Sequence, residues 1–283
     1  MAMSERIAHP GYDTFRYTIE SKVGAFPVVE VKPSQLKSQV PVTIATGWSE
    51  GPPVFTQVQA VLAIRGRQSF VFDHPRWGGN VTPNTLHPEA ELRKAYALLA
   101  LLDERRITKT DVLAHSEGAI YAIMAATLAP EKFRNFVLVA PGGMIGKDAF
   151  PQLLGRFSHK VGANIRQGLT DNVTFPVVLQ AHLGAAAYIA KNPLRALREA
   201  VAISQSQIQG MLKALHEQGF GIVIIHGAND KAFPMQRIQK IAHADQFDGI
   251  LSVTGMHDDL YVYPHKDTAA AEEMLSALEI KRP

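Results

Sequence analysis

A serine stands where an apolar strand is predicted to turn into a helix. In the segment Asp111-Val-Leu-Ala-His-Ser-Glu-Gly-Ala-Ile, Ser116 occupies the corner, and Ala114 and Gly118 lie two positions to either side. Small residues are needed there because strand, helix and neighbouring backbone approach closely. The helix that begins at Glu117 would turn free N–H groups towards a developing oxyanion. Ser116 is therefore the candidate nucleophile, and a plain helix N-cap is the alternative that this pattern alone leaves open.

An acid and a histidine follow two later predicted strands. Asp230 ends the segment Ile225-His-Gly-Ala-Asn-Asp, and His257 stands in Gly255-Met-His. A histidine can take the proton of a serine hydroxyl, and a carboxylate can fix the tautomer of that histidine. Because the carboxyl ends of parallel strands meet at one edge of a sheet, we expect Ser116, Asp230 and His257 to meet there. The alternatives are a turn residue paired with Lys231 for Asp230 and a surface histidine for His257.

Other polar residues in these segments are assigned structural roles. His115, next to the candidate nucleophile, is predicted to pack away from it, and His226 is predicted to support its own loop. Asp258 and Asp259 follow His257 too closely to hold its ring easily, so we expect them to be loop or helix-capping acids. The carboxylate of Glu117 suits a helix N-terminus electrostatically, which could be its whole role.

Strands and helices alternate through most of the chain. Eight strands are predicted at 14–20, 28–32, 40–45, 69–73, 111–114, 136–140, 221–226 and 250–254, with helices at 57–65, 88–106, 117–128, 234–242 and 266–278. Between 147 and 218 only helix-like segments occur, with breakers at Pro151, Gly155, Gly162, Gly168, Pro176 and Pro193. This predicts an α/β protein with a mostly parallel eight-stranded sheet and helices on both faces. Residues 1–146 and 219–283 would form the core, and 147–218 a helical cap insertion.

The composition is that of an ordinary globular chain and excludes several classes of function. Of 283 residues, 46% are hydrophobic and 19% are charged, with a net charge of +3 and no block of like charges, so no nucleic-acid partner is expected. Cysteine is absent, which removes thiolate nucleophiles and thiolate metal sites. Without a P-loop, a dinucleotide-binding fingerprint or a His-Glu-x-x-His pattern, no cofactor or metal is expected. With neither a signal peptide nor a membrane span in view, a cytoplasmic protein without a membrane partner is the default.

With these segments in place, the chain resembles the α/β-hydrolase superfamily over nearly its whole length. Thr46-Gly-Trp-Ser-Glu-Gly looks like the loop after the third strand that supplies half of the oxyanion hole, and Asp73-His-Pro-Arg-Trp-Gly looks like the turn after the fourth. Residues 130–141 resemble the strand after the nucleophile helix. The order Ser, Asp, His is the one that this family uses. The resemblance implies that the backbone N–H groups of Trp48 and Glu117 form the oxyanion hole.

Three positions depart from the family pattern. Thr46 stands where histidine is common, and Ala114 and Arg76 stand where glycine is common. Alanine at the turn is compatible with Ser116 as nucleophile. Thr46 and Arg76 leave the subfamily open and weaken the assignment of the first oxyanion-hole donor.

The resemblance implies a serine hydrolase of the esterase or lipase kind. We expect it to cleave a small or medium apolar carboxylic ester through an acyl-enzyme, because 150–157 and 173–190 are rich in Phe, Leu, Val and Ala and could roof an apolar pocket. These residues could equally be the core of the cap itself. The alternatives are a carbon–carbon bond hydrolase or hydroxynitrile-lyase-like enzyme on the same triad, and a non-catalytic ligand-binding protein of this fold. The oligomeric state stays open.

Overall fold

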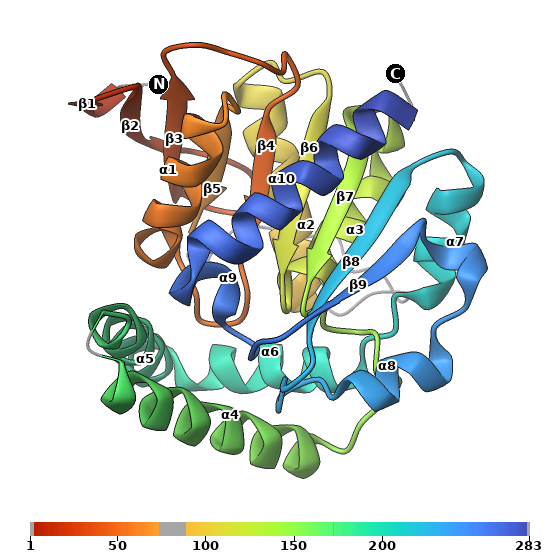
Figure 1. Cartoon of the computed structure of the whole chain (residues 1–283). Coiled ribbons are helices and arrows are strands. Elements are labelled where there is room, and N and C mark those ends of the chain that lie inside the picture. Colours follow the sequence, from red (N-terminus) through yellow and green to blue (C-terminus); the bar gives the residue numbers. More distant parts are fainter. Residues whose placement is uncertain (1–2, 74–88, 172, 282–283) are drawn as a thin grey trace.

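A sheet of nine strands forms the centre of the protein (Figure 1). The computed structural model describes residues 3–73, 89–171 and 173–281. The strand order is β1-β2-β3-β5-β4-β6-β7-β8-β9. Neighbours from β5 to β9 pair in parallel, whereas β1, β2 and β3 pair antiparallel and β3 pairs antiparallel with β5. The strands are β1 Met3–His9, β2 Tyr12–Ile19, β3 Phe26–Pro33, β4 Val42–Ala45, β5 Ser69–Phe72, β6 Thr110–His115, β7 Phe133–Val139, β8 Gly221–Gly227 and β9 Gly249–Val253. The predicted α/β class and mostly parallel sheet are confirmed.

One of the nine strands, β1, is not predicted from the sequence pattern. The eight predicted strands correspond to β2 through β9, and β1 is additional. Its sequence, Met-Ser-Glu-Arg-Ile-Ala-His, lacks a clean alternation of apolar and polar residues. It lies at the edge of the sheet and pairs only with β2. An edge strand with little buried surface needs little apolar patterning, which is why the prediction of eight strands was one short.

Helices cover both faces of the sheet, as predicted. On one face lie α1 (Thr56–Ile64), α9 (Asp259–Val262) and α10 (Pro264–Lys281), whose buried residues share a core with the strands. On the other lie α2 (Glu89–Glu104), α3 (Gly118–Leu128) and α7 (Gln209–Glu217). In α2, Leu98, Leu101 and Leu102 are fully buried, at the spacing of one helix face. Burying one such side chain stabilises the fold by about 1.5–3 kcal/mol, so Leu101→Ala would weaken this packing.

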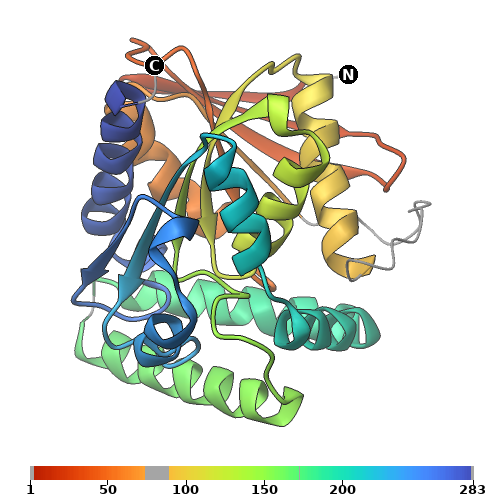
Figure 2. The same ribbon diagram turned by 90° about the vertical axis from the view of Figure 1, so that its right-hand side faces the viewer.

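The chain between β7 and β8 is all helical. It contains α4 (Phe150–Thr170), α5 (Phe175–Lys191), α6 (Pro193–Gln205) and α7. Figures 1 and 2 show α4, α5 and α6 as a layer across one end of the sheet, with α8 (Met235–Ile241) beside them. We call α4, α5 and α6 the cap helices. Helix α7 instead packs against α3 on the face of the sheet. The division into a core and a cap at 147–218 remains a prediction. None of the described helices has the length and apolar character needed to cross a bilayer.

The residues expected to break this helical region act in two different ways. Pro151, Pro176 and Pro193 stand in the first turns of α4, α5 and α6. A proline is tolerated there because its missing N–H would have no partner within the helix. Gly155, Gly162 and Gly168 all lie inside α4, so the predicted breaks at these glycines are wrong. A glycine inside a helix costs only about 1 kcal/mol relative to alanine, which a long packed helix can absorb.

Candidate active site

The turn after β6 holds Ser116 in a conformation that L-residues rarely adopt. Its φ is 54°, in the left-handed region that costs a non-glycine residue free energy. Two backbone bonds hold it there: the Ser116 N–H donates to the Val139 carbonyl at 3.0 Å, and the Gly142 N–H donates to the Ser116 carbonyl at 2.8 Å. A Cβ atom at Gly118 would lie 2.1 Å from the carbonyl oxygen of Ala45, so only glycine fits. The strand, turn and helix therefore have the tight geometry predicted from their sequence.

Ser116, His257 and Asp230 form a hydrogen-bonded row. His257 Nε2 lies 3.0 Å from Ser116 Oγ, and His257 Nδ1 lies 2.8 Å from Asp230 Oδ2. The other oxygen of Asp230 accepts bonds from the N–H groups of Ala232 and Phe233, at 2.7 and 3.0 Å. Burial alone would raise the pKa of Asp230, but the adjacent His257 and the bond from its ring hold that pKa below its usual value. The structure thus brings together three residues that the sequence places far apart.

The two predicted oxyanion donors lie in segments that flank this row. Within the described ranges, no acceptor is bound by the backbone N–H of Trp48 or of Glu117. The loop that carries Trp48 is held by the N–H of Gly47, which donates to Glu50 Oε2 at 2.7 Å. The hydroxyl of Tyr121, in α3, also holds this loop, because it donates to the Thr46 carbonyl at 3.1 Å. Both backbone donors are therefore uncommitted, as an anion-binding site requires.

His115 links this loop to the histidine loop. Its Nδ1 lies 2.9 Å from Glu50 Oε2, and its Nε2 lies 2.9 Å from the carbonyl oxygen of His257. Because a carbonyl only accepts, Nε2 must carry a proton. Burial alone would lower the pKa of His115, but the Glu50 carboxylate outweighs it and the pKa is raised. The ring therefore hydrogen-bonds two functional loops, a larger role than the packing expected from the sequence.

Asp258 joins the histidine loop to a cap helix. Its carboxylate accepts a bond from Lys160 Nζ of α4 at 2.9 Å and another from the Asn164 side chain. Burial alone would raise the pKa of Asp258, but Lys160 and the nearby histidines lower it. Its side chain makes no capping bond to α9, and Asp259 pairs with Lys266 at 3.2 Å. Neither acid contacts the His257 ring as Asp230 does, but Asp258 fixes α4 over the site.

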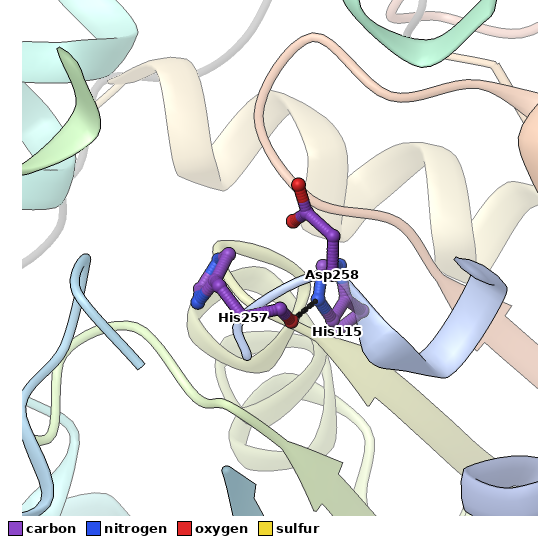
Figure 3. Close-up of side chains that lie close together, drawn as sticks. All are labelled: His115, His257 and Asp258. Carbon is purple, nitrogen blue, oxygen red and sulfur yellow. Dashed lines mark hydrogen bonds between the residues drawn. The ribbon is translucent and has the colours of Figure 1, made fainter. Parts of the chain in front are cut away.

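His115, His257 and Asp258 come close enough together to raise the question of a metal ion. Their potential ligand atoms lie within 4.8 Å of one another, and Figure 3 shows the bond between the His115 ring and the His257 carbonyl. Each of these atoms already has a partner, however: Asp230 and Ser116 for His257, Glu50 and a carbonyl for His115, and an ammonium and an amide for Asp258. The cluster is a hydrogen-bond network, and its donor set does not fit a metal ion.

A buried ion cluster lies on the other side of the turn. Glu117 Oε1 is 2.5 Å from Lys94 Nζ of α2, which is also 3.3 Å from Glu199 of α6. Glu199 in turn accepts a bond from the Tyr188 hydroxyl of α5 at 2.6 Å. Burial raises the pKa of Glu91 well above its usual value, which favours a protonated carboxyl that can donate to Glu117. The Glu117 carboxylate thus connects the turn to the cap, a role beyond the electrostatic match to a helix end that was expected.

The row is closed off from solvent. Ser116 and His257 are 3% and 1% exposed. The ring of Phe157, on α4, lies 6.2 Å from the His257 ring and 5.6 Å from that of Trp48. An apolar cavity of about 10 Å³, the size of one water molecule, adjoins them. It is lined by Trp48, Phe150, Leu153, Leu154, Phe157, Ala200 and Ile203. Among the described residues, the side chains beside Phe157 therefore leave little free space next to the row.

Two further sequence assignments concern the surroundings of the site. His226 Nε2 donates to the Phe233 carbonyl, 2.8 Å away, and so supports the acid loop as predicted. Residues 74–78 of the turn after the fourth predicted strand, Arg76 among them, lie outside the described residues. The pairings of Glu117 with Lys94 and of His115 with Glu50 were missed because the partners lie in other segments of the chain. A charged residue predicted to be fully buried beside the nucleophile is the signal that could have found them.

The chain is similar in structure to several solved proteins. A hydrolase from Pseudomonas aeruginosa PA01 has a TM-score of 0.65 at 15% identity, covering 92% of this chain and 98% of the other. A thermophilic esterase from Thermogutta terrifontis has 0.67 at 16%, covering 93% and 98%. A serine hydrolase from Cycloclasticus zankles has 0.70 at 13%, covering 94% and 99%. No family model and no curated protein matches the sequence. The chain has the fold of the α/β-hydrolase superfamily.

Proposed function

We propose that this protein is a serine hydrolase that cleaves a small or medium apolar carboxylic ester through an acyl-enzyme. One observation carries the proposal: the Ser116 hydroxyl, the His257 ring and the Asp230 carboxylate are joined by bonds of 3.0 and 2.8 Å. These are the residue types and the connectivity that activate a serine. Two of the three similar structures are named an esterase and a serine hydrolase, which agrees with the proposal.

The reaction follows from the roles of the three side chains. Ser116 Oγ attacks the ester carbonyl carbon while His257 Nε2 takes its proton, and Asp230 stabilises the imidazolium that forms. The imidazolium then returns the proton to the leaving alcohol as the C–O bond breaks. Water attacks the acyl-enzyme by the same route and releases the acid. The N–H groups of Trp48 and Glu117 would bind the oxyanion, and loss of one such donor costs about 3 kcal/mol of transition-state stabilisation.

The walls of the site support an apolar acyl or aryl group. The cavity beside Phe157 is lined only by apolar and aromatic side chains. Such a lining excludes water and strengthens the electrostatic interactions with the oxyanion. This cavity has only about 10 Å³ of free space, so a substrate group that occupied it would have to move side chains of α4 or α6. The cytoplasmic location expected from the sequence stays a prediction.

The test is hydrolysis of p-nitrophenyl butyrate by Ser116→Ala. We expect the rate to fall by about 10⁴-fold or more, because removing the nucleophile disables the whole triad. Ser158→Ala is the matched control, since this residue is exposed on α4 and its hydroxyl donates to the Leu154 carbonyl of the same helix. Equal turnover by wild type and Ser116→Ala would contradict the proposal.

A fluorophosphonate probe separates the alternatives. Labelling of Ser116 together with ester turnover supports an esterase. Labelling without turnover on any ester points to a carbon–carbon bond hydrolase or a hydroxynitrile-lyase-like enzyme on the same triad. No labelling at all points to a ligand-binding protein that keeps the fold.

A further inference from the structure

The outer side of the cap exposes most of the large apolar side chains on the surface. Among the described residues, sixteen large hydrophobic side chains are exposed, and eleven of them lie between residues 154 and 201. They are Leu154, Val161, Ile165, Leu169, Val173, Leu179, Leu183, Ile189, Leu194, Leu197 and Val201. Single exposed apolar residues are normal on any protein, but a gathering on one end of the molecule marks an interaction surface.

The spacing of these side chains turns them to one side of each helix. Val161, Ile165 and Leu169 are four residues apart in α4, and Leu179 and Leu183 are four apart in α5. Residues three or four apart lie on the same face of a helix. Figures 1 and 2 show the three cap helices together in one layer at the end of the molecule. We call the exposed side chains of α4, α5 and α6 the cap face.

The cap face carries no exposed acid. From 150 to 205, the exposed positions of the described residues include Arg166, Lys191 and Arg198 but no aspartate or glutamate. The two acids of this stretch, Asp171 and Glu199, are partly or fully buried and hydrogen-bonded. The whole chain has 26 acidic against 29 basic residues, so this separation of charge is local. The face is therefore apolar and cationic.

We propose that the cap face docks on an anionic lipid surface. Apolar side chains inserted at the headgroup level together with cations attract a protein to anionic lipid. A second copy of the chain fits less well. A two-fold dimer would bring the cap face against itself, and its cations would then meet cations with no exposed acid to pair with them. The docking is peripheral, and it departs from the expectation of no membrane partner, which rested on the missing membrane span.

The position of the cap face suggests where the substrate enters, an extension that rests on the proposed function. Leu154 is 49% exposed on this face and also lines the apolar cavity beside Phe157. A lipid surface that draws Leu154 and its neighbours outwards would open the cavity towards the lipid. An apolar ester dissolved in that lipid would then reach Ser116 without crossing water.

The experiment measures vesicle binding in the Ser116→Ala background, so that it does not depend on turnover. Sedimentation is compared for vesicles of phosphatidylcholine alone and of phosphatidylcholine with phosphatidylglycerol. We expect binding to the anionic vesicles, weakened by added salt. The double substitution Leu179→Glu with Leu183→Glu should lower the partition coefficient about ten-fold or more, because a charge replaces an inserted apolar group. Ile64→Glu, at a 70% exposed position on α1, should change it less than about two-fold.

Two controls keep the outcome clear. Arg166→Glu with Lys191→Glu should also reduce binding to anionic vesicles, and the thermal midpoint of each variant reports whether it folds. The proposal would be overturned if Ser116→Ala bound neither vesicle type, or if the added Leu179 and Leu183 substitutions left its binding unchanged. A dimer seen by light scattering that the same two substitutions dissociate would overturn it too, since the cap face would then be covered by a second copy. Absence of esterase activity in the wild type, by contrast, contradicts the proposed function and leaves vesicle binding standing.

Discussion

The rim of the sheet around Ser116 buries polar side chains, whereas the outer side of the cap exposes apolar ones. At the rim, Ser116, His257, Asp230 and His115 are buried, and each is held by hydrogen bonds to named partners. On the cap face, apolar side chains stand in solvent. A buried polar network holds its members in fixed positions because every unpaired group is costly. Exposed apolar side chains are not held in place in this way, but they gain free energy when a partner buries them. The first region is built for positioning, and the second for contact.

The largest expected effect lies at the rim, in Asp230→Asn. This change keeps the shape but removes the charge that stabilises the His257 imidazolium, so the turnover number for p-nitrophenyl butyrate should fall about 10⁴-fold. Asp259→Asn is the matched control, because Asp259 pairs with Lys266 and not with the triad. Steady-state rates for the two variants give the comparison. Similar losses in both would mean that the position of Asp230 has no special role.

The contact between rim and cap is the next test. Lys160→Met leaves the Asp258 carboxylate buried without its ammonium partner, which was 2.9 Å away. Removing one partner of a buried pair typically lowers the free energy of unfolding by about 3–5 kcal/mol. Urea unfolding of wild type and Lys160→Met measures this difference in the free energy of unfolding. Lys213→Met, which breaks a pair of half-exposed residues with Asp245, should give no measurable change. A stable Lys160→Met protein would show that α4 is not held by this pair.

A smaller effect should appear in the pH dependence of stability. The pKa of His115 is raised because Glu50 outweighs the effect of burial, and Asp258 and His257 also face the ring. Because the pKa is raised in the folded protein, protonated His115 contributes fully to the free energy of unfolding below the ordinary pKa of about 6.5. This stabilisation is lost as the pH rises through the folded pKa. Free energies of unfolding from about pH 5.5 to 9 should show that decline, and Glu50→Gln should flatten it. The same slope in both proteins would argue against a charged His115.

The smallest effect is expected on the cap face. Leu183 is 62% exposed, so Leu183→Gln should change the free energy of unfolding by no more than about 0.5 kcal/mol. Leu212→Ala, at a fully buried position of α7, should cost about 2–5 kcal/mol in the same measurement. A loss above about 2 kcal/mol in Leu183→Gln would show that this side chain is covered in solution.

The parts of the molecule that the sequence reveals are those governed by local pattern. The turn at Ser116 is visible because strand, small residues and helix are adjacent in the chain. The sites of Asp230 and His257 follow from their places after strands, since strand ends converge at one edge of a sheet. The strand β1 escapes detection because an edge strand needs little apolar pattern.

Two features could not be predicted from the sequence: which distant residues form ion pairs, and which side of a helix is exposed. Lys94 pairs with both Glu117 and Glu199, and these three residues lie in separate helices or turns, so no local pattern predicts that they meet. The apolar residues of α5 were predicted either to roof a pocket or to pack in the core of the cap. Several of them, Leu179 and Leu183 included, instead face outwards. An amino-acid pattern gives the period of a helix, but which side is covered depends on what packs against it.

The separation of the site residues along the chain has a consequence for synthesis. Ser116 and His257, whose side chains bond at 3.0 Å, are 141 residues apart. A protein emerges from the ribosome in order, at about 5–20 residues per second. The turn with its serine is therefore synthesised many seconds before the histidine. If the proposed function holds, Ser116 of the nascent chain has no base to activate it until β9 and the loop after it have been synthesised and have folded.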